Sequence, residues 1–115
     1  MPRKTKTSQS SEAIKVFVRV RPPISNEVTY ENAITVTSTT SLKLSSDKHN
    51  LSCTYNHIFN DLASQNDVFD EIRPLLADVL LGYNGCIFAY GQTSAGKTHT
   101  MLGPNGGTNL NVPKE

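Results

Sequence analysis

The sequence predicts an α/β fold, in which an incomplete sheet is flanked by helices and joined to a small antiparallel β meander. Three observations predict it. The chain opens with an alternating strand pattern, a long amphipathic helix lies in its middle, and an apolar run leads directly into a glycine-rich loop and a second helix. The order strand, meander, helix, strand, loop, helix is typical of helices that cover a sheet.

Length and composition indicate a single globular unit. The chain has 115 residues, enough for one domain with a modest core, and 37% hydrophobic residues argue against disorder throughout. A net charge of +1 gives no field that would favour nucleic acid or an anionic membrane. No apolar run approaches the roughly 20 residues of a membrane span, and no signal peptide is visible. We therefore expect a cytoplasmic protein with neither nucleic acid nor membrane as partner.

The two ends and the two cysteines add little chemistry. Residues 1–12 carry a cluster of basic side chains among Ser and Thr, and we expect a flexible tail, with a weak contact to an acidic partner as the alternative. Residues 104–115 are rich in Gly, Pro and Asn and predict a loop or tail. Cys53 and Cys86 lie in apolar contexts and are expected to be free, buried thiols.

The first half of the domain, which we place at residues 13–103, predicts strands. Residues 14–21 alternate, with apolar side chains on one face, and the pair Pro22-Pro23 ends this strand because neither proline can donate to a ladder. Three short β-prone pieces then follow, separated by turn-forming residues. They are expected to form the antiparallel meander and cover residues 33–37, 42–44 and 51–55.

The second half predicts two helices around one buried strand. Residues 64–81 have apolar side chains at three- and four-residue spacing, expected to pack on a sheet, with Ser64 and Asp67 in a capping-box pattern and Gly82 after the end. Residues 85–90 form an apolar run that suits a central strand buried on both faces. A short helix is expected over residues 97–102.

Residues 91–98 match the phosphate-loop pattern G-x-x-x-x-G-K-[ST] at every fixed position. The glycines let the backbone curl so that successive N–H groups point at phosphate oxygens, and the following helix adds its positive end. Lys97 would bring a mobile charge to the β- and γ-phosphates, and the Thr98 hydroxyl is placed to bind Mg²⁺. The predicted ligands of ATP and Mg²⁺ here are Gly91, Gln92, Thr93, Ser94, Ala95, Gly96, Lys97 and Thr98.

This loop pattern is specific. A chance match is expected in well under about 1% of chains of this length. The required context, a buried strand before the loop and a helix after it, is also predicted. The alternative is a glycine-rich strand-to-helix turn with an incidental Lys-Thr pair.

The residues around the loop narrow the family. The segment Gly82 to Met101, read as GYNGCIFAYGQTSAGKTHTM, resembles the phosphate-loop segment of kinesins. Upstream, Val16 to Pro22 is similar to the first strand of that family, with its R-x-R-P ending. The resemblance runs from about residue 13 to residue 103 and corresponds to the first part of a kinesin motor domain.

Kinesins are microtubule-stimulated ATPases, and the resemblance implies ATP, Mg²⁺ and microtubules as ligands and partner, and a cytoskeletal location. By position, Arg19, Pro22 and His99 would border the adenine. The alternatives are a solvated sheet-edge charge for Arg19, a strand terminator for Pro22 and a helix-surface residue for His99. Arg21 fits either a structural role or a ligand contact. Oligomeric state, cargo and direction of travel are not indicated. Tyr83 and Tyr90 favour packing over base stacking.

The chain also departs from the family pattern. Tyr55-Asn56 stands where Phe-Asp is expected, a change that should affect a local turn and not the nucleotide. Residues 112–114 are either a divergent form of the family's next segment or unrelated sequence. Neither switch segment, N-x-x-S-S-R or D-x-x-G, appears in the 115 residues. Because these segments sense the γ-phosphate, we assign no catalytic residue and expect these residues alone not to hydrolyse ATP.

Three functions therefore stay open. The first is the ATP-binding part of a kinesin-like microtubule motor that continues beyond residue 115. The second is a non-catalytic fragment that binds nucleotide weakly or acts by interaction. The third is another loop-bearing NTPase, such as a small kinase or GTPase, although these usually place the loop after their first strand.

Overall fold

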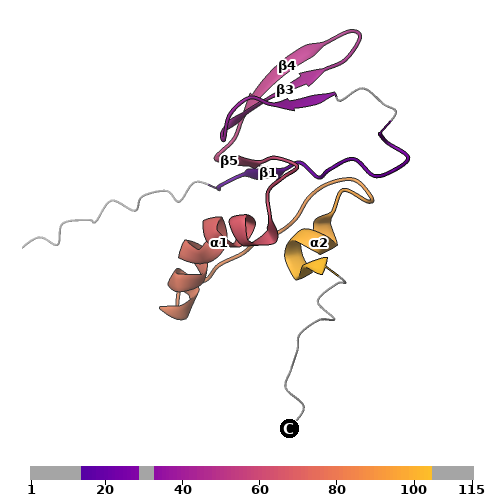
Figure 1. Ribbon diagram of the computed structural model, residues 1–115. Coiled ribbons are helices and arrows are strands. Elements are labelled where there is room, and N and C mark those ends of the chain that lie inside the picture. The colour runs from indigo at the N-terminus through magenta and orange to yellow at the C-terminus, as the bar shows by residue number, and fades with distance from the viewer. Residues whose placement is uncertain (1–13, 29–32, 105–115) are drawn as a thin grey trace, which may run out of the picture.

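The computed structural model describes residues 14–28 and 33–104, and Figure 1 shows their arrangement. The predicted tail at residues 1–12 and the segment 105–115 lie outside the described residues. In Figure 1 the meander stands at one end, a second pair of strands lies beneath it, and both helices lie on the far side of that pair. The elements are β1 (Phe17–Arg19), β2 (Ile34–Val36), β3 (Ser41–Ser45), β4 (Asn50–Thr54), β5 (His57–Phe59), α1 (Gln65–Leu80) and α2 (Lys97–Leu102).

The predicted meander is confirmed. Strands β2, β3 and β4 form an antiparallel sheet in that order, with Leu42 opposite Cys53 and Leu44 opposite Leu51. Such a sheet forms readily because each strand pairs with its neighbour in sequence across a short turn. The β2–β3 turn also contacts β5, since the Ile58 amide donates to the Thr39 carbonyl oxygen at 2.7 Å.

Strand β1 is shorter than residues 14–21 and pairs in parallel with β5, a strand that the sequence did not predict. Three residues are too few to show an alternating pattern. Asn56 extends this pairing: its side-chain oxygen accepts from the Val16 amide at 2.8 Å, and its own amide donates to the Val16 carbonyl at 3.0 Å. Asn56 therefore acts on the pairing of β1 with β5, whereas the sequence suggests an effect on a local turn.

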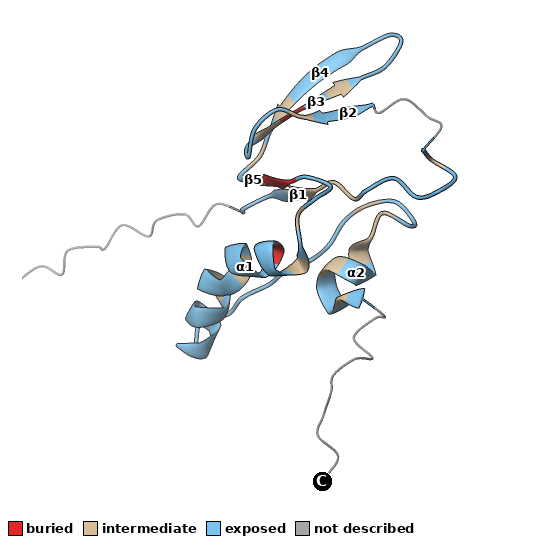
Figure 2. Cartoon of the chain, viewed as in Figure 1, coloured by how far each residue is buried: buried red, intermediate tan, exposed pale blue. Residues whose placement is uncertain are grey.

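The core is small and lies where the two sheets and the start of α1 meet. Four apolar side chains in the described residues are buried, and Figure 2 shows them on β3, β5 and α1. They are Leu42, Ile58, Phe59 and Val68. The Phe59 ring packs edge-on against Phe17, with 6.4 Å between centroids. Burial of these apolar side chains stabilises the junction of the two sheets and α1.

Helix α1 begins as predicted. The Ser64 hydroxyl accepts from the Asp67 amide at 3.2 Å, and the Asp67 carboxylate accepts from the Ser64 amide at 2.7 Å, which completes the capping box. Gly82, with a φ of +95°, follows the end of the helix. The apolar stripe is only partly covered: Val68 is buried and Ile72 and Leu75 are half-buried. Its other members are exposed: Phe69, Leu76, Val79 and Leu80. The expected packing of the whole stripe on a sheet is therefore wrong.

The expected central strand at residues 85–90 is also wrong. Residues 83–90 have no regular structure, and every one of them is exposed. A strand exists through hydrogen bonds to its neighbours, and in the described residues β1 and β5 pair with each other and not with this run. Consequently Cys86 is exposed, and Tyr83 and Tyr90 do not pack as predicted. Cys53, on β4 of the meander, is half-buried rather than buried.

Helix α2 spans the predicted residues and ends at Gly103, whose φ is +82°. It lies beside the start of α1, because the Gln65 side-chain amide donates to the Thr100 carbonyl oxygen at 2.7 Å. In the part of the chain that the structure describes, neither helix is long and apolar enough to cross a bilayer.

Candidate nucleotide-binding site

Two residues of the loop at 91–96 have a left-handed backbone conformation. Ser94 has a φ of +67° and Gly96 a φ of +98°. Alternation of this kind curls the main chain into a concavity that suits an anion. Ser94 is the one non-glycine residue with positive φ among residues 14–28 and 33–104, and this conformation costs about 1–2 kcal/mol. Surrounding contacts must therefore hold it.

The start of the loop is tightly closed. A Cβ atom at Gly91 would approach the Ala95 Cβ to 3.0 Å, closer than ordinary van der Waals contact. The Ala95 amide donates to the Gln92 carbonyl oxygen at 3.1 Å, which forms a turn over residues 92–95. A side chain at residue 91 would thus press against Ala95, which favours the fixed glycine of the pattern.

Lys97 folds back over this turn. Its Nζ atom donates to the carbonyl oxygens of Gly91 at 2.7 Å and Gln92 at 2.8 Å. The residue is half-buried, so the ammonium group is held at the loop. These two carbonyls are dipoles, whereas a phosphate oxygen carries formal charge and accepts a shorter, stronger hydrogen bond. A triphosphate can therefore displace them from Lys97.

Thr98 lies in the first turn of α2 and is exposed. Its hydroxyl is a hard oxygen ligand of the kind that Mg²⁺ prefers. The tight loop that favours glycine at residue 91, the Lys97 ammonium and the Thr98 hydroxyl fit a magnesium-bound polyphosphate.

Arg19 is not a solvated charge at a sheet edge. Its Nη1 atom donates to the Gln65 side-chain oxygen at 2.7 Å and to the Thr100 hydroxyl at 3.2 Å. It thereby joins β1 to the start of α1 and to the last turn of α2, next to His99. Its guanidinium is half-buried at the junction that positions the loop.

Pro22 follows β1, His99 lies in α2 directly after the loop, and both residues are exposed. The Pro22 carbonyl oxygen accepts from Arg21 at 3.1 Å, and the His99 carbonyl oxygen accepts from the Gly103 amide at 2.8 Å. These contacts use backbone atoms of Pro22 and His99, and the adenine contact of the two side chains stays a prediction.

Arg21 is held by protein groups. It forms a two-pronged ion pair with Glu27, with both N–O distances at 2.7 Å, and its Nε atom donates to the Ser94 carbonyl at 3.1 Å. The hydrogen bonds from Arg21, aided by the Ile24 amide, lower the pKa of Glu27 from 4.5 to about 2. The Glu27 carboxylate is therefore charged at neutral pH.

Three residues of this junction were not predicted from the sequence: Glu27, Gln65 and Thr100. Gln65 and Thr100 contact Arg19 across separations of 46 and 81 residues, and no local pattern signals contacts of that range. Glu27 lies close to Arg21 in sequence, but the irregular loop between them shows no periodicity that would place the two side chains together.

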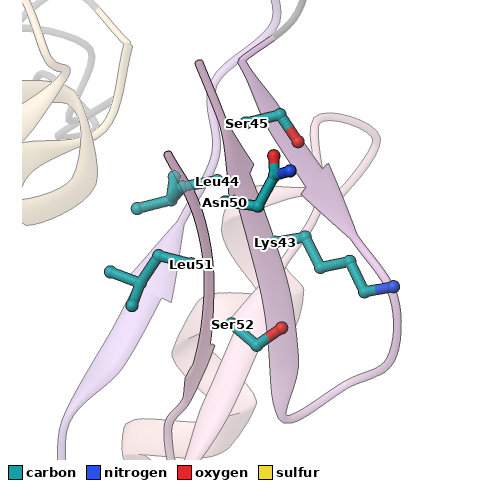
Figure 3. A pocket seen from close by; sticks show the side chains of 6 residues that line it. All are labelled: Lys43, Leu44, Ser45, Asn50, Leu51 and Ser52. Carbon is teal, nitrogen blue, oxygen red and sulfur yellow. The ribbon is translucent and has the colours of Figure 1, made fainter. Parts of the chain in front are cut away.

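Two other hollows do not suit a nucleotide. One of about 370 Å³ lies on the meander, where Figure 3 shows Leu44 and Leu51 side by side, and its lining includes one charged group, Lys43. The other, of about 470 Å³, lies between β5 and the start of α1 and is lined by Asp67, Asp70 and Glu71. Its carboxylates would repel phosphate.

Comparison with known proteins identifies the family of this chain. The family model for the kinesin motor domain matches residues 3–112. The chain is 40% identical over 109 residues to the kinesin-like protein KIF15-B of Xenopus laevis, covering 90% of this chain and 8% of that protein. It is 44% identical over 97 residues to the kinesin-like protein KIN-14P of Oryza sativa, covering 79% of this chain and 10% of that protein.

Solved structures show the same likeness. A fast kinesin is 36% identical with a TM-score of 0.76, and the match covers 88% of this chain and 28% of that one. The motor domain of a Kar3-like kinesin from Ashbya gossypii is 39% identical with a TM-score of 0.70, covering 76% and 31%. The chain thus spans a tenth or less of the curated relatives named above and under a third of these structures, and a small kinase or GTPase is excluded. This chain belongs to the kinesin motor domain family.

Proposed function

We propose that this chain is the ATP- and Mg²⁺-binding part of a microtubule motor. The observation that carries the proposal is Lys97, whose ammonium lies on the Gly91 and Gln92 carbonyls at the turn of the phosphate loop. An ammonium at that position neutralises the terminal phosphates of a nucleotide. Bound Mg²⁺, with Thr98 as a ligand, would neutralise more of the same charge.

The other predicted contacts complete the proposed site. Loop residues 91–96 would surround the phosphates with backbone N–H groups, and Arg19, Pro22 and His99 would border the adenine. Arg19 lies in β1 and donates to the Thr100 hydroxyl of α2, and this position beside the helix that follows the loop supports its proposed role. By analogy with the family, the intact protein would hydrolyse ATP to move along microtubules and would be found on the cytoskeleton.

A second candidate is nucleotide binding without hydrolysis. The absence of both switch patterns from the 115 residues favours it for these residues taken alone. Phosphate release by the full-length protein, measured with and without microtubules, separates the two candidates. Microtubule-stimulated release supports the motor, and ATP binding without release supports the second candidate.

The binding proposal is tested by Lys97→Ala in the full-length protein, with Mg-ATP affinity measured by equilibrium dialysis. A hydrogen bond to a charged group contributes about 1.5–3 kcal/mol, so affinity should fall by roughly 10- to 100-fold or more. Lys43→Ala removes the same side chain from the exposed face of β3 and should leave affinity unchanged. Equal affinity of the wild-type and Lys97→Ala proteins would overturn the assignment.

A further inference from the structure

Arg21 links two segments that are 73 residues apart in the sequence. It lies in the loop after β1, and its Nε atom donates to the carbonyl oxygen of Ser94 in the phosphate loop. Figure 1 shows these two segments running next to each other above α2. Among the described residues, this is the contact that reaches the one strained non-glycine position.

Glu27 fixes the direction in which Arg21 donates. Its two carboxylate oxygens accept from Nη1 and Nη2, each at 2.7 Å, so the guanidinium plane cannot rotate freely. Glu27 is itself held in a turn, since its amide donates to the Ile24 carbonyl at 2.8 Å and its carboxylate accepts from the Ile24 amide at 3.2 Å. The remaining Nε–H group then faces Ser94.

The contact at Ser94 continues into the part of the loop that holds Lys97. The Ser94 carbonyl and the Ala95 amide belong to one planar peptide group, so fixing the first orients the second. The Ala95 amide donates to the Gln92 carbonyl, and that same oxygen accepts from Lys97 at 2.8 Å. A connected series of hydrogen bonds therefore runs from Glu27 through Arg21 to Lys97.

We propose that Arg21, oriented by Glu27, is a positioning residue that holds the turn Gln92–Ala95 in its phosphate-binding shape and so raises the affinity for Mg-ATP. The inference rests on the proposed ATP binding and assigns a cause to part of it. Arg21 acts through Ser94 and does not touch the nucleotide. Its own hydrogen bonds to the protein already occupy four donor–acceptor contacts.

The first test is Glu27→Gln in the full-length protein, which keeps the side-chain shape and removes the charge. Affinity for Mg-ATP should fall by about 5- to 10-fold, while the midpoint of thermal unfolding without nucleotide stays within a few degrees of wild type. The matched control is Asp70→Asn. It removes the carboxylate of another Arg pair, Asp70–Arg73 on the exposed face of α1, and should leave affinity unchanged.

The second test separates positioning from charge. Arg21→Lys keeps the positive charge, but one ammonium cannot reproduce the fork to Glu27 together with the bond to Ser94. Arg21→Lys should therefore lose as much affinity as Glu27→Gln, and the double variant should lose no more than either single one. Full affinity in Arg21→Lys would show a simple charge effect and overturn the proposal.

A third readout needs no nucleotide. Hydrogen exchange of the Ala95 amide should be faster in Glu27→Gln than in wild type, because the turn opens more often. Failure of the wild-type protein to bind Mg-ATP would refute the proposed function, whereas unchanged Ala95 exchange and unchanged affinity in Glu27→Gln would refute the positioning role alone.

Discussion

The meander and the apolar run at residues 85–90 were both predicted as strands, yet of these two segments only the meander forms strands in the structure. Each meander strand pairs with the next one along the chain, and Leu42 of β3 is buried. Every residue of the apolar run 85–90 is exposed, and the run pairs with no strand in the described residues. Apolar character therefore favours burial of a segment, but a strand forms only where a partner strand is present.

Two phenylalanines, one in each region, test the difference in packing with the largest expected effect. Phe59 on β5 is 4% exposed, and Phe88 in the unpaired run is 75% exposed. Phe59→Ala should cost about 3–5 kcal/mol of unfolding free energy, whereas Phe88→Ala should stay within about 0.5 kcal/mol. Urea unfolding of the 115-residue chain followed by circular dichroism measures both. A comparable loss in the two variants would mean that the run packs in solution.

A smaller effect is expected at the start of α1, the other element whose boundaries follow from local residues. Ser64→Ala removes the oxygen that accepts from the Asp67 amide and should cost about 1 kcal/mol. Ser52→Ala, on exposed β4, is the matched control and should be close to neutral. If thermal unfolding midpoints of the two variants coincide, the capping box contributes nothing to stability.

The smallest effect concerns the pH dependence of stability. Glu27 has its pKa lowered to about 2 by Arg21, so its ion pair stabilises the folded chain fully above pH 4.5 and is lost as pH falls toward 2. Glu27→Gln should flatten the decline of the urea midpoint in that window. Asp67, whose pKa is lowered by Ser64, keeps part of the slope in the variant. An unchanged slope in Glu27→Gln would contradict the stabilising role of the ion pair.

The contrast between local pairing and pairing with a distant partner also explains how much of the fold and site the sequence predicts. The meander, the capping box at Ser64, the end of α2 at Gly103 and the loop pattern at residues 91–98 all depend on neighbours within a few positions. Strand β5 is too short to signal itself. The contacts of Arg19 with Gln65 and Thr100, and of Arg21 with Ser94, join residues 46 to 81 positions apart. Such contacts depend on the folded topology, which no local pattern encodes.

The loop at residues 91–98 is proposed to hold a magnesium-bound adenine nucleotide. Calorimetric titration of the full-length protein with ATP, before and after chelation of Mg²⁺, tests it most directly. We expect binding that weakens when Mg²⁺ is removed, and a smaller dependence on Mg²⁺ in Thr98→Val, which lacks the hydroxyl. Absence of ATP binding, or equal affinity with and without Mg²⁺, would contradict the claim.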